Sequence, residues 1–172
     1  MKTLFLDFDG VLNSKQHYLA VINKRFKGAD NLNDADLFAM KRNVAPHHMW
    51  ILGFILKQIP DLKIVISSAW GHHYTLEQFK ELFKIFKLDE TRLIGITPRK
   101  MSSYRCNEIH WWLEDNPADQ WIAVDDHVIF NLEDPDKKNE YLTDSWVGLT
   151  MRDAVKIIRH FDPTYQPPQF EI

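Results

Sequence analysis

Residues 1–13 read MKTLFLDFDGVLN, and they carry the clearest indication of the fold. Residues 3–8 form a mostly apolar run that contains Asp7. Asp9 and Gly10 follow this run directly. A short apolar run bounded by a glycine predicts a buried β-strand. Two carboxylates this close repel each other, so at least one pKa rises unless a positive charge lies between them. The stretch therefore predicts a strand that delivers two acids to a site for a cation.

Similar apolar runs recur along the chain, and helical patterns separate them. The predicted strands after the first are 62–68 (LKIVISS), 92–97 (RLIGIT), 121–126 (WIAVDD) and a weaker one at 140–144 (EYLTD). Four helices are predicted between and after these strands. The first spans 46–59, and the second follows the capping box of Thr75 and Gln78. The third is indicated by helical spacing of Cys106, Ile109, Trp112 and Leu113, and the fourth follows the capping box of Thr150 and Asp153. This alternation is typical of an α/β fold with a three-layer, Rossmann-like parallel sheet.

Polar side chains follow the predicted strands at the points where the strands end. In a parallel sheet these ends lie at one rim, where ligands bind. The sequence therefore predicts that four acids and several hydroxyls converge on one rim. These residues are Asp7, Asp9, Ser67, Ser68, Thr97, Asp125 and Asp126.

One segment does not fit the simple alternation. Residues 14–43 are too long for a loop between a strand and a helix, so we expect a small helical insert or flap after strand one. The rest of residues 1–172 is predicted to form one domain around the sheet. The insert carries basic residues that we expect near the rim acids, namely Lys15, Lys24, Arg25, Lys27, Lys41 and Arg42.

The overall composition excludes several classes of protein. A net charge of −3 does not favour nucleic acid or membrane as a partner of the whole surface. One cysteine, Cys106, cannot build a disulfide framework or a cysteine zinc site. No secretory signal or membrane-spanning run is recognisable, so we expect a soluble, cytoplasmic protein without a membrane contact. Nothing in the sequence calls for an obligate protein partner.

Acids gathered at one rim indicate a hard metal ion. Oxygen ligands without thiols suit Mg²⁺, which binds through carboxylates, waters and substrate phosphates. One of two neighbouring carboxylates can attack phosphorus and form an aspartyl-phosphate. The other can protonate the leaving oxygen and later activate water. The pattern thus favours a Mg²⁺-dependent phosphoryl-transfer enzyme.

These motifs resemble those of the haloacid dehalogenase (HAD) superfamily of phosphohydrolases. LFLDFDGVLN is similar to its first motif, KIVISS to its second and WIAVDD to its fourth, and Arg105 stands where a lone basic residue forms the third. SSAW and GLTMRDAVKII resemble the small, nearly capless HAD-like domains of RNA-repair proteins. The chain departs from these patterns at Gly71, where that group has Arg, and at Asn13, where the superfamily often has Thr.

The resemblance implies a role for each motif residue. Asp7 would be the nucleophile and Asp9 the general acid and base. Ser67 would bind the phosphoryl group and Arg105 would neutralise it, with Ser68 and Lys100 or Arg99 as alternatives. The Mg²⁺ ligands would be Asp7, Asp9, Asp125 and Asp126, and Gly10, Ser68 and Lys100 would lie against the substrate.

The sequence leaves more than one function and more than one substrate class open. We expect a phosphatase with a poorly covered site, which suits nucleic-acid ends, phosphoproteins or nucleotides. The basic insert and the aromatic residues favour a nucleic-acid end or a nucleotide, with sugar phosphates as the alternative. A catalytically silent binding module is the second hypothesis. Trp70, with the neighbouring His72, His73 and Tyr74, is expected to pack the rim against the insert rather than to stack bases. Whether His127 contacts substrate is left open.

Overall fold

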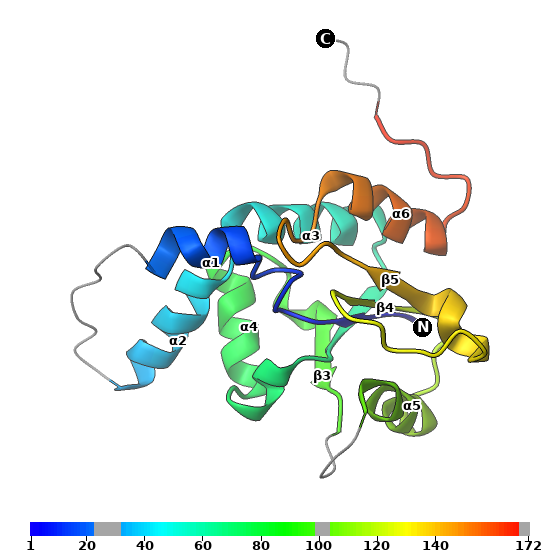
Figure 1. The fold of residues 1–172 in the computed structure, drawn as a ribbon, viewed down its shortest axis with the longest axis horizontal. Helices are drawn as coiled ribbons and strands as arrows, with labels where there is room; N and C mark the ends of the chain where they lie inside the picture. Colours follow the sequence, from blue (N-terminus) through cyan, green and yellow to red (C-terminus); the bar gives the residue numbers. More distant parts are fainter. Residues whose placement is uncertain (23–31, 99–103, 169–172) are drawn as a thin grey trace.

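Five parallel strands form one sheet in the order β3-β2-β1-β4-β5 (Figure 1). The computed structural model describes residues 1–22, 32–98 and 104–168. Arg99, Lys100, Lys24, Arg25 and Lys27, which the sequence places near the site, lie outside these ranges. The strands are β1 (Lys2–Leu6), β2 (Leu62–Ile66), β3 (Leu93–Ile96), β4 (Gln120–Asp125) and β5 (Glu140–Leu142).

Helices cover both faces of the sheet, so the chain has three layers. They are α1 (Lys15–Ile22), α2 (Leu32–Asn43), α3 (Pro46–Gln58), α4 (Leu76–Ile85), α5 (Arg105–Asp115) and α6 (Met151–Phe161), with short 3₁₀ helices η1 (Ala69–His72), η2 (Glu90–Arg92) and η3 (Pro135–Asn139). α3 and α6 pack together on one face and α5 lies on the other (Figure 1). This architecture confirms the predicted three-layer α/β fold.

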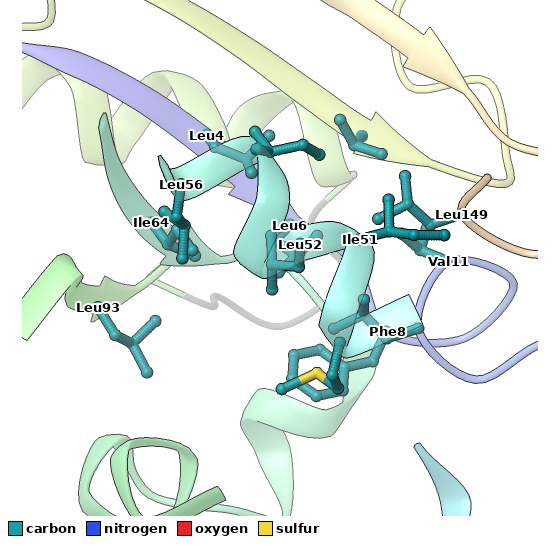
Figure 2. Packing of buried hydrophobic residues seen from close by; sticks show 14 of the residues in the cluster. Leu4, Leu6, Phe8, Val11, Ile51, Leu52, Leu56, Ile64, Leu93 and Leu149 are labelled. Atoms are coloured by element: carbon teal, nitrogen blue, oxygen red, sulfur yellow. The ribbon is translucent and has the colours of Figure 1, made fainter. Parts of the chain in front are cut away.

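The central strands β1, β2 and β4 are mostly apolar because both of their faces are buried. Successive side chains of β1 alternate between the two cores, since a strand has a period of two. Leu6 faces the larger core, where Figure 2 shows Leu52 and Leu56 of α3 lying over strand residues. Phe5 faces the smaller core and meets Trp112 and Trp121 edge-on, with ring centroids 5.5 and 5.7 Å away.

The helices begin where capping chemistry predicts. The Thr75 hydroxyl accepts the Gln78 N–H, and the Gln78 side chain accepts the Thr75 N–H at 2.8 Å. Thr150 and Asp153 make the same reciprocal pair at the start of α6. Such caps satisfy otherwise unpaired N–H groups, and each stabilises its helix by about 1 kcal/mol. Both predicted capping boxes are therefore confirmed.

The predicted helical insert contains α1 and α2. The start of α1 is held by two main-chain hydrogen bonds: Lys15 N–H donates to the Ser145 carbonyl at 3.0 Å, and Gln16 N–H to the Trp146 carbonyl at 3.2 Å. These bonds fix the first turn of α1 against the chain that follows β5. Among the described helices, none combines the length and apolar character that a membrane crossing requires.

Candidate active site

The predicted rim residues lie side by side because the strand register aligns them. Leu6 pairs with Ile66 on one side and with Val124 on the other, so the next residues are Asp7, Ser67 and Asp125. All three are nearly inaccessible, with 5, 2 and 3% of their surface exposed. Ionisable and hydroxyl side chains are rarely this buried unless a partner is present. The rim is therefore a site rather than a solvated edge.

Arg105, the first residue of α5, lies between the two buried acids. Its Nη1 atom is 3.2 Å from Asp7 Oδ1 and 3.4 Å from Asp125 Oδ2. Burial raises the pKa of Asp7 from 3.8 to about 7, and the charge of Asp125 adds to this, while Arg105 and a hydrogen bond from Ser68 lower it. Burial also raises the pKa of Asp125, against the effect of Arg105. One guanidinium thus does not compensate both carboxylates, which leaves a place for a cation.

The two serines after β2 have different surroundings. Ser68 donates a hydrogen bond to Asp7, and its hydroxyl accepts the Trp70 N–H at 3.3 Å. The Ser67 hydroxyl is buried and, within the described part of the chain, has no hydrogen-bond partner. A buried hydroxyl is normally paired, so an unpaired one beside the two acids is a candidate donor to a bound ligand.

The loop after β1 turns sharply and carries Asp9. β1 ends at Leu6, earlier than the predicted 3–8, because the Phe8 carbonyl accepts the N–H groups of Val11, Leu12 and Asn13 at 2.7 to 3.2 Å. Asp9 is exposed, and both of its oxygens accept side-chain hydrogen bonds. Asn13 Nδ2 donates to Oδ1 at 2.7 Å and Trp70 Nε1 donates to Oδ2 at 2.9 Å.

Gly10 acts through its backbone in this loop. Its φ is +71°, and a Cβ at this position would lie 2.3 Å from Asp126 Cγ. Its carbonyl accepts the Thr143 hydroxyl at 2.9 Å. The sequence placed Gly10 against substrate, and it does line the pocket. Its absent side chain also leaves the space that Asp126 occupies.

Gly10→Ala is expected to destabilise the protein by about 1–3 kcal/mol, because an alanine is strained at positive φ and displaces Asp126. Urea unfolding measures the loss. Gly95→Ala is the matched control, since its new Cβ meets only the Trp112 side chain, with Nε1 at 3.3 Å and Cε2 at 4.0 Å, and its φ lies outside the left-handed region. An unfolding midpoint for Gly10→Ala equal to that of the unmodified protein contradicts this account.

The acids at the end of β4 form a compact group with His127. Asp125 Oδ1 accepts the His127 N–H at 2.9 Å, and His127 Nδ1 lies 2.5 Å from Asp126 Oδ1. Ligand atoms of Asp125, Asp126 and His127 all lie within 4.8 Å of one another. The predicted acids Asp125 and Asp126 are therefore close enough to share one ion, and His127 lies beside them.

A pocket of about 460 Å³ opens over the rim. Four of its lining residues, Asn13, Lys15, Tyr18 and Ala69, were not predicted to line it, although Lys15 was expected nearby. α1 brings Lys15 and Tyr18 to the pocket, and Tyr18 is about half exposed. The remaining lining residues are Asp7, Asp9, Gly10, Arg105, Asp126 and His127.

The strand order and the acids at the ends of β1 and β4 define a class, the Rossmann-like α/β domains with an acidic rim. A comparison with protein families narrows it. Residues 3–154 match the family described as "HAD domain in Swiss Army Knife RNA repair proteins", and the chain belongs to this family. Comparisons with curated proteins and with solved structures find no significant match. The family supports a HAD-type phosphohydrolase in general.

Proposed function

We propose that this protein is a Mg²⁺-dependent phosphomonoesterase that works through an aspartyl-phosphate on Asp7. The observation that carries the proposal is the buried Asp7 carboxylate at the end of β1, held 3.2 Å from Arg105 and lining a pocket. A carboxylate beside a fixed guanidinium can attack a phosphorus atom whose oxygens that guanidinium binds. Asp9, two residues after Asp7 in the sequence, can act as the proton donor.

The chain's own residues supply both chemical steps. Asp7 forms an O–P bond while the bond from phosphorus to the leaving oxygen breaks, and Asp9 gives its proton to that oxygen. A water molecule then attacks phosphorus, Asp9 takes a proton from it, and the Asp7 carboxylate leaves. Arg105 and the unpaired Ser67 hydroxyl would bind the phosphoryl oxygens as charge builds up on them.

The donor set fits the metal ion that the family implies. Asp7, Asp125 and Asp126 offer carboxylate oxygens, the lining residues include no thiol, and the raised pKa values of Asp7 and Asp125 indicate uncompensated charge. These residues, with the Asp9 main-chain carbonyl, would hold Mg²⁺. When bound, the ion neutralises negative charge on the phosphate and on the carboxylates.

We further propose a nucleic-acid end or a nucleotide as the phosphorylated substrate. The description of the family as one of RNA-repair proteins supports this choice. So does the pocket wall, where Tyr18 offers an aromatic ring and Lys15 a cation. Aromatic rings stack on bases with little sequence preference, and cations attract the nucleic-acid backbone.

Phosphate release tests the proposed function directly. The panel contains para-nitrophenyl phosphate, a 3′-phosphorylated oligonucleotide, a 5′-phosphorylated one, a nucleoside monophosphate and a sugar phosphate, each with Mg²⁺ and with EDTA. We expect Mg²⁺-dependent release that is fastest with a nucleic-acid or nucleotide substrate. Release from the sugar phosphate alone contradicts the substrate choice. A folded, Mg²⁺-loaded protein that releases phosphate from no substrate favours a silent binding module instead.

A further inference from the structure

Asp9 is held at both of its carboxylate oxygens by two side chains that carry no ionisable proton. Trp70 Nε1 donates to Oδ2 at 2.9 Å and Asn13 Nδ2 donates to Oδ1 at 2.7 Å. An indole N–H and an amide N–H only donate here, and neither titrates near neutral pH. The two donors can therefore orient Asp9 without competing with it for a proton.

Trp70 is itself firmly placed. Only 8% of its surface is exposed, and its ring packs on Phe8 and Tyr74 with centroids 4.9 and 5.6 Å away. The main-chain N–H of Trp70 donates to the Ser68 hydroxyl, and this hydroxyl caps η1. Because Ser68 also bonds Asp7, Trp70 has contacts with both acids of the site, one direct and one through Ser68.

Asn13 is placed by the turn that contains Asp9. Its N–H donates to the Phe8 carbonyl at 2.7 Å, and its carbonyl accepts the Gly10 N–H at 2.9 Å. The two bonds close the loop around Asp9 and fix the backbone from which the Asn13 side chain extends to Asp9. Asn13 thus approaches Asp9 from its own loop, while Trp70 reaches it from the segment after β2.

We propose that Trp70 and Asn13 are positioning residues that orient Asp9 for proton transfer to the leaving oxygen. The inference rests on the proposed function. Asp9 is exposed, so without these donors its carboxyl group would rotate freely. Each carboxylate oxygen has two acceptor positions, so one N–H bond per oxygen leaves the other position for the proton. Fixing the group before substrate binds avoids losing that freedom in the transition state.

Loss of the donors that orient Asp9 has a kinetic effect that a loss of packing does not produce. A poor leaving group needs a proton as its bond to phosphorus breaks, while a good leaving group departs without one. Misplacing Asp9 therefore slows phenyl phosphate more than para-nitrophenyl phosphate. The quantity to compare is kcat/KM, since it reports the steps up to formation of the aspartyl-phosphate.

The test compares kcat/KM for these two aryl phosphates in each variant. Trp70→Phe keeps the ring and removes the N–H. We expect kcat/KM to fall about tenfold more for phenyl phosphate than for para-nitrophenyl phosphate, a part of the 10²–10⁴ that general acid catalysis supplies. Asn13→Ala is expected to change the ratio in the same direction.

Trp121→Phe is the matched control. It is equally buried, with 9% exposed, but lies near the start of β4, at the opposite end of the sheet from the rim. Its ratio is expected to equal that of the unmodified protein. Because both substrates are measured on one preparation, the ratio does not depend on the fraction of folded protein. It can therefore be read even from a destabilised variant, and Asn13→Ala provides a second reading.

The outcomes separate this inference from the proposed function. If the unmodified protein releases phosphate and both variants keep its leaving-group ratio, positioning by Trp70 and Asn13 is wrong and the proposed function stands. A ratio that shifts equally in Trp121→Phe also overturns the inference. If the unmodified protein releases no phosphate from either substrate, the proposed function itself fails.

Discussion

Replacing Asp7 by Asn abolishes phosphate release, with an expected loss of roughly 10⁴- to 10⁶-fold in kcat. The reason is chemical: an amide oxygen is a far weaker nucleophile than a carboxylate, so the O–P bond of the aspartyl-phosphate does not form. The Arg105 guanidinium remains in place but has no attacking group beside it. Phosphate release from the best substrate, measured with Mg²⁺ present, gives the residual rate.

The same substitution is not expected to unfold the protein. Asn has the shape of Asp, and it removes a carboxylate whose burial already raises the pKa to about 7. Asp61→Asn is the matched control. Asp61 is exposed, lies just before the start of β2 and far from the rim, and forms an ion pair with Lys2. We expect it to keep full activity. Asp7→Ala guards against deamidation of the new Asn, and substantial turnover in Asp7→Ala would rule out the covalent mechanism.

The sheet and its acidic rim could be predicted from the sequence because local signals determine them. Residues 4–6 and 121–124 are apolar runs that lead directly into acids, and in a parallel sheet the ends of such strands lie at the same edge. The start of α5 at Arg105 then brings a basic residue to the same rim. These features depend on strand period and sheet direction, which a single sequence carries.

The finer contacts of the site could not be predicted in this way. The bond from Trp70 to Asp9 joins residues 61 positions apart, and nothing in either local sequence specifies it. Trp70 was expected to pack the rim against the insert, and the ring contacts shown are with Phe8 and Tyr74, which lie outside the insert. The additional role of its N–H is visible only once η1 and the loop after β1 lie together.

The choice between Ser67 and Ser68 shows the same limit. Successive residues near a strand end point in different directions, so an uncertainty of one residue exchanges their surroundings. The structure ends β2 at Ile66 and shows that Ser68 bonds Asp7 while Ser67 is unpaired. Tyr18 was missed for a related reason: its approach to the pocket depends on the main-chain bonds that hold the start of α1.

Mg²⁺ is expected to raise the melting temperature of the metal-free protein, and the gain should be larger at about pH 8 than at about pH 5. The sign follows from Asp7. Its pKa is 3.8 in the unfolded chain and about 7 in the folded protein. Below the lower value both states are protonated, and between the two values only the unfolded chain releases its proton. The metal-free protein therefore loses stability as pH rises toward 7.

The expected size follows from the same two values. At about 1.4 kcal/mol for each pH unit between them, the loss amounts to a few kcal/mol. For a chain of this length that corresponds to on the order of 10–20 °C in melting temperature. Mg²⁺ offsets the loss because it binds the ionised carboxylates. At about pH 5 it must first displace protons, so its gain there is smaller.

Thermal unfolding at both pH values, with EDTA or with Mg²⁺, measures these gains. Asp125→Asn removes one proposed ligand and one repelling charge, so both the Mg²⁺ gain and the pH dependence should shrink, whereas Asp61→Asn should keep both. Equal melting temperatures with Mg²⁺ and EDTA at about pH 8 would argue against a metal site at this rim. Since unfolding needs no substrate, a gain without any phosphate release would place Mg²⁺ at the rim of a protein that binds but does not hydrolyse.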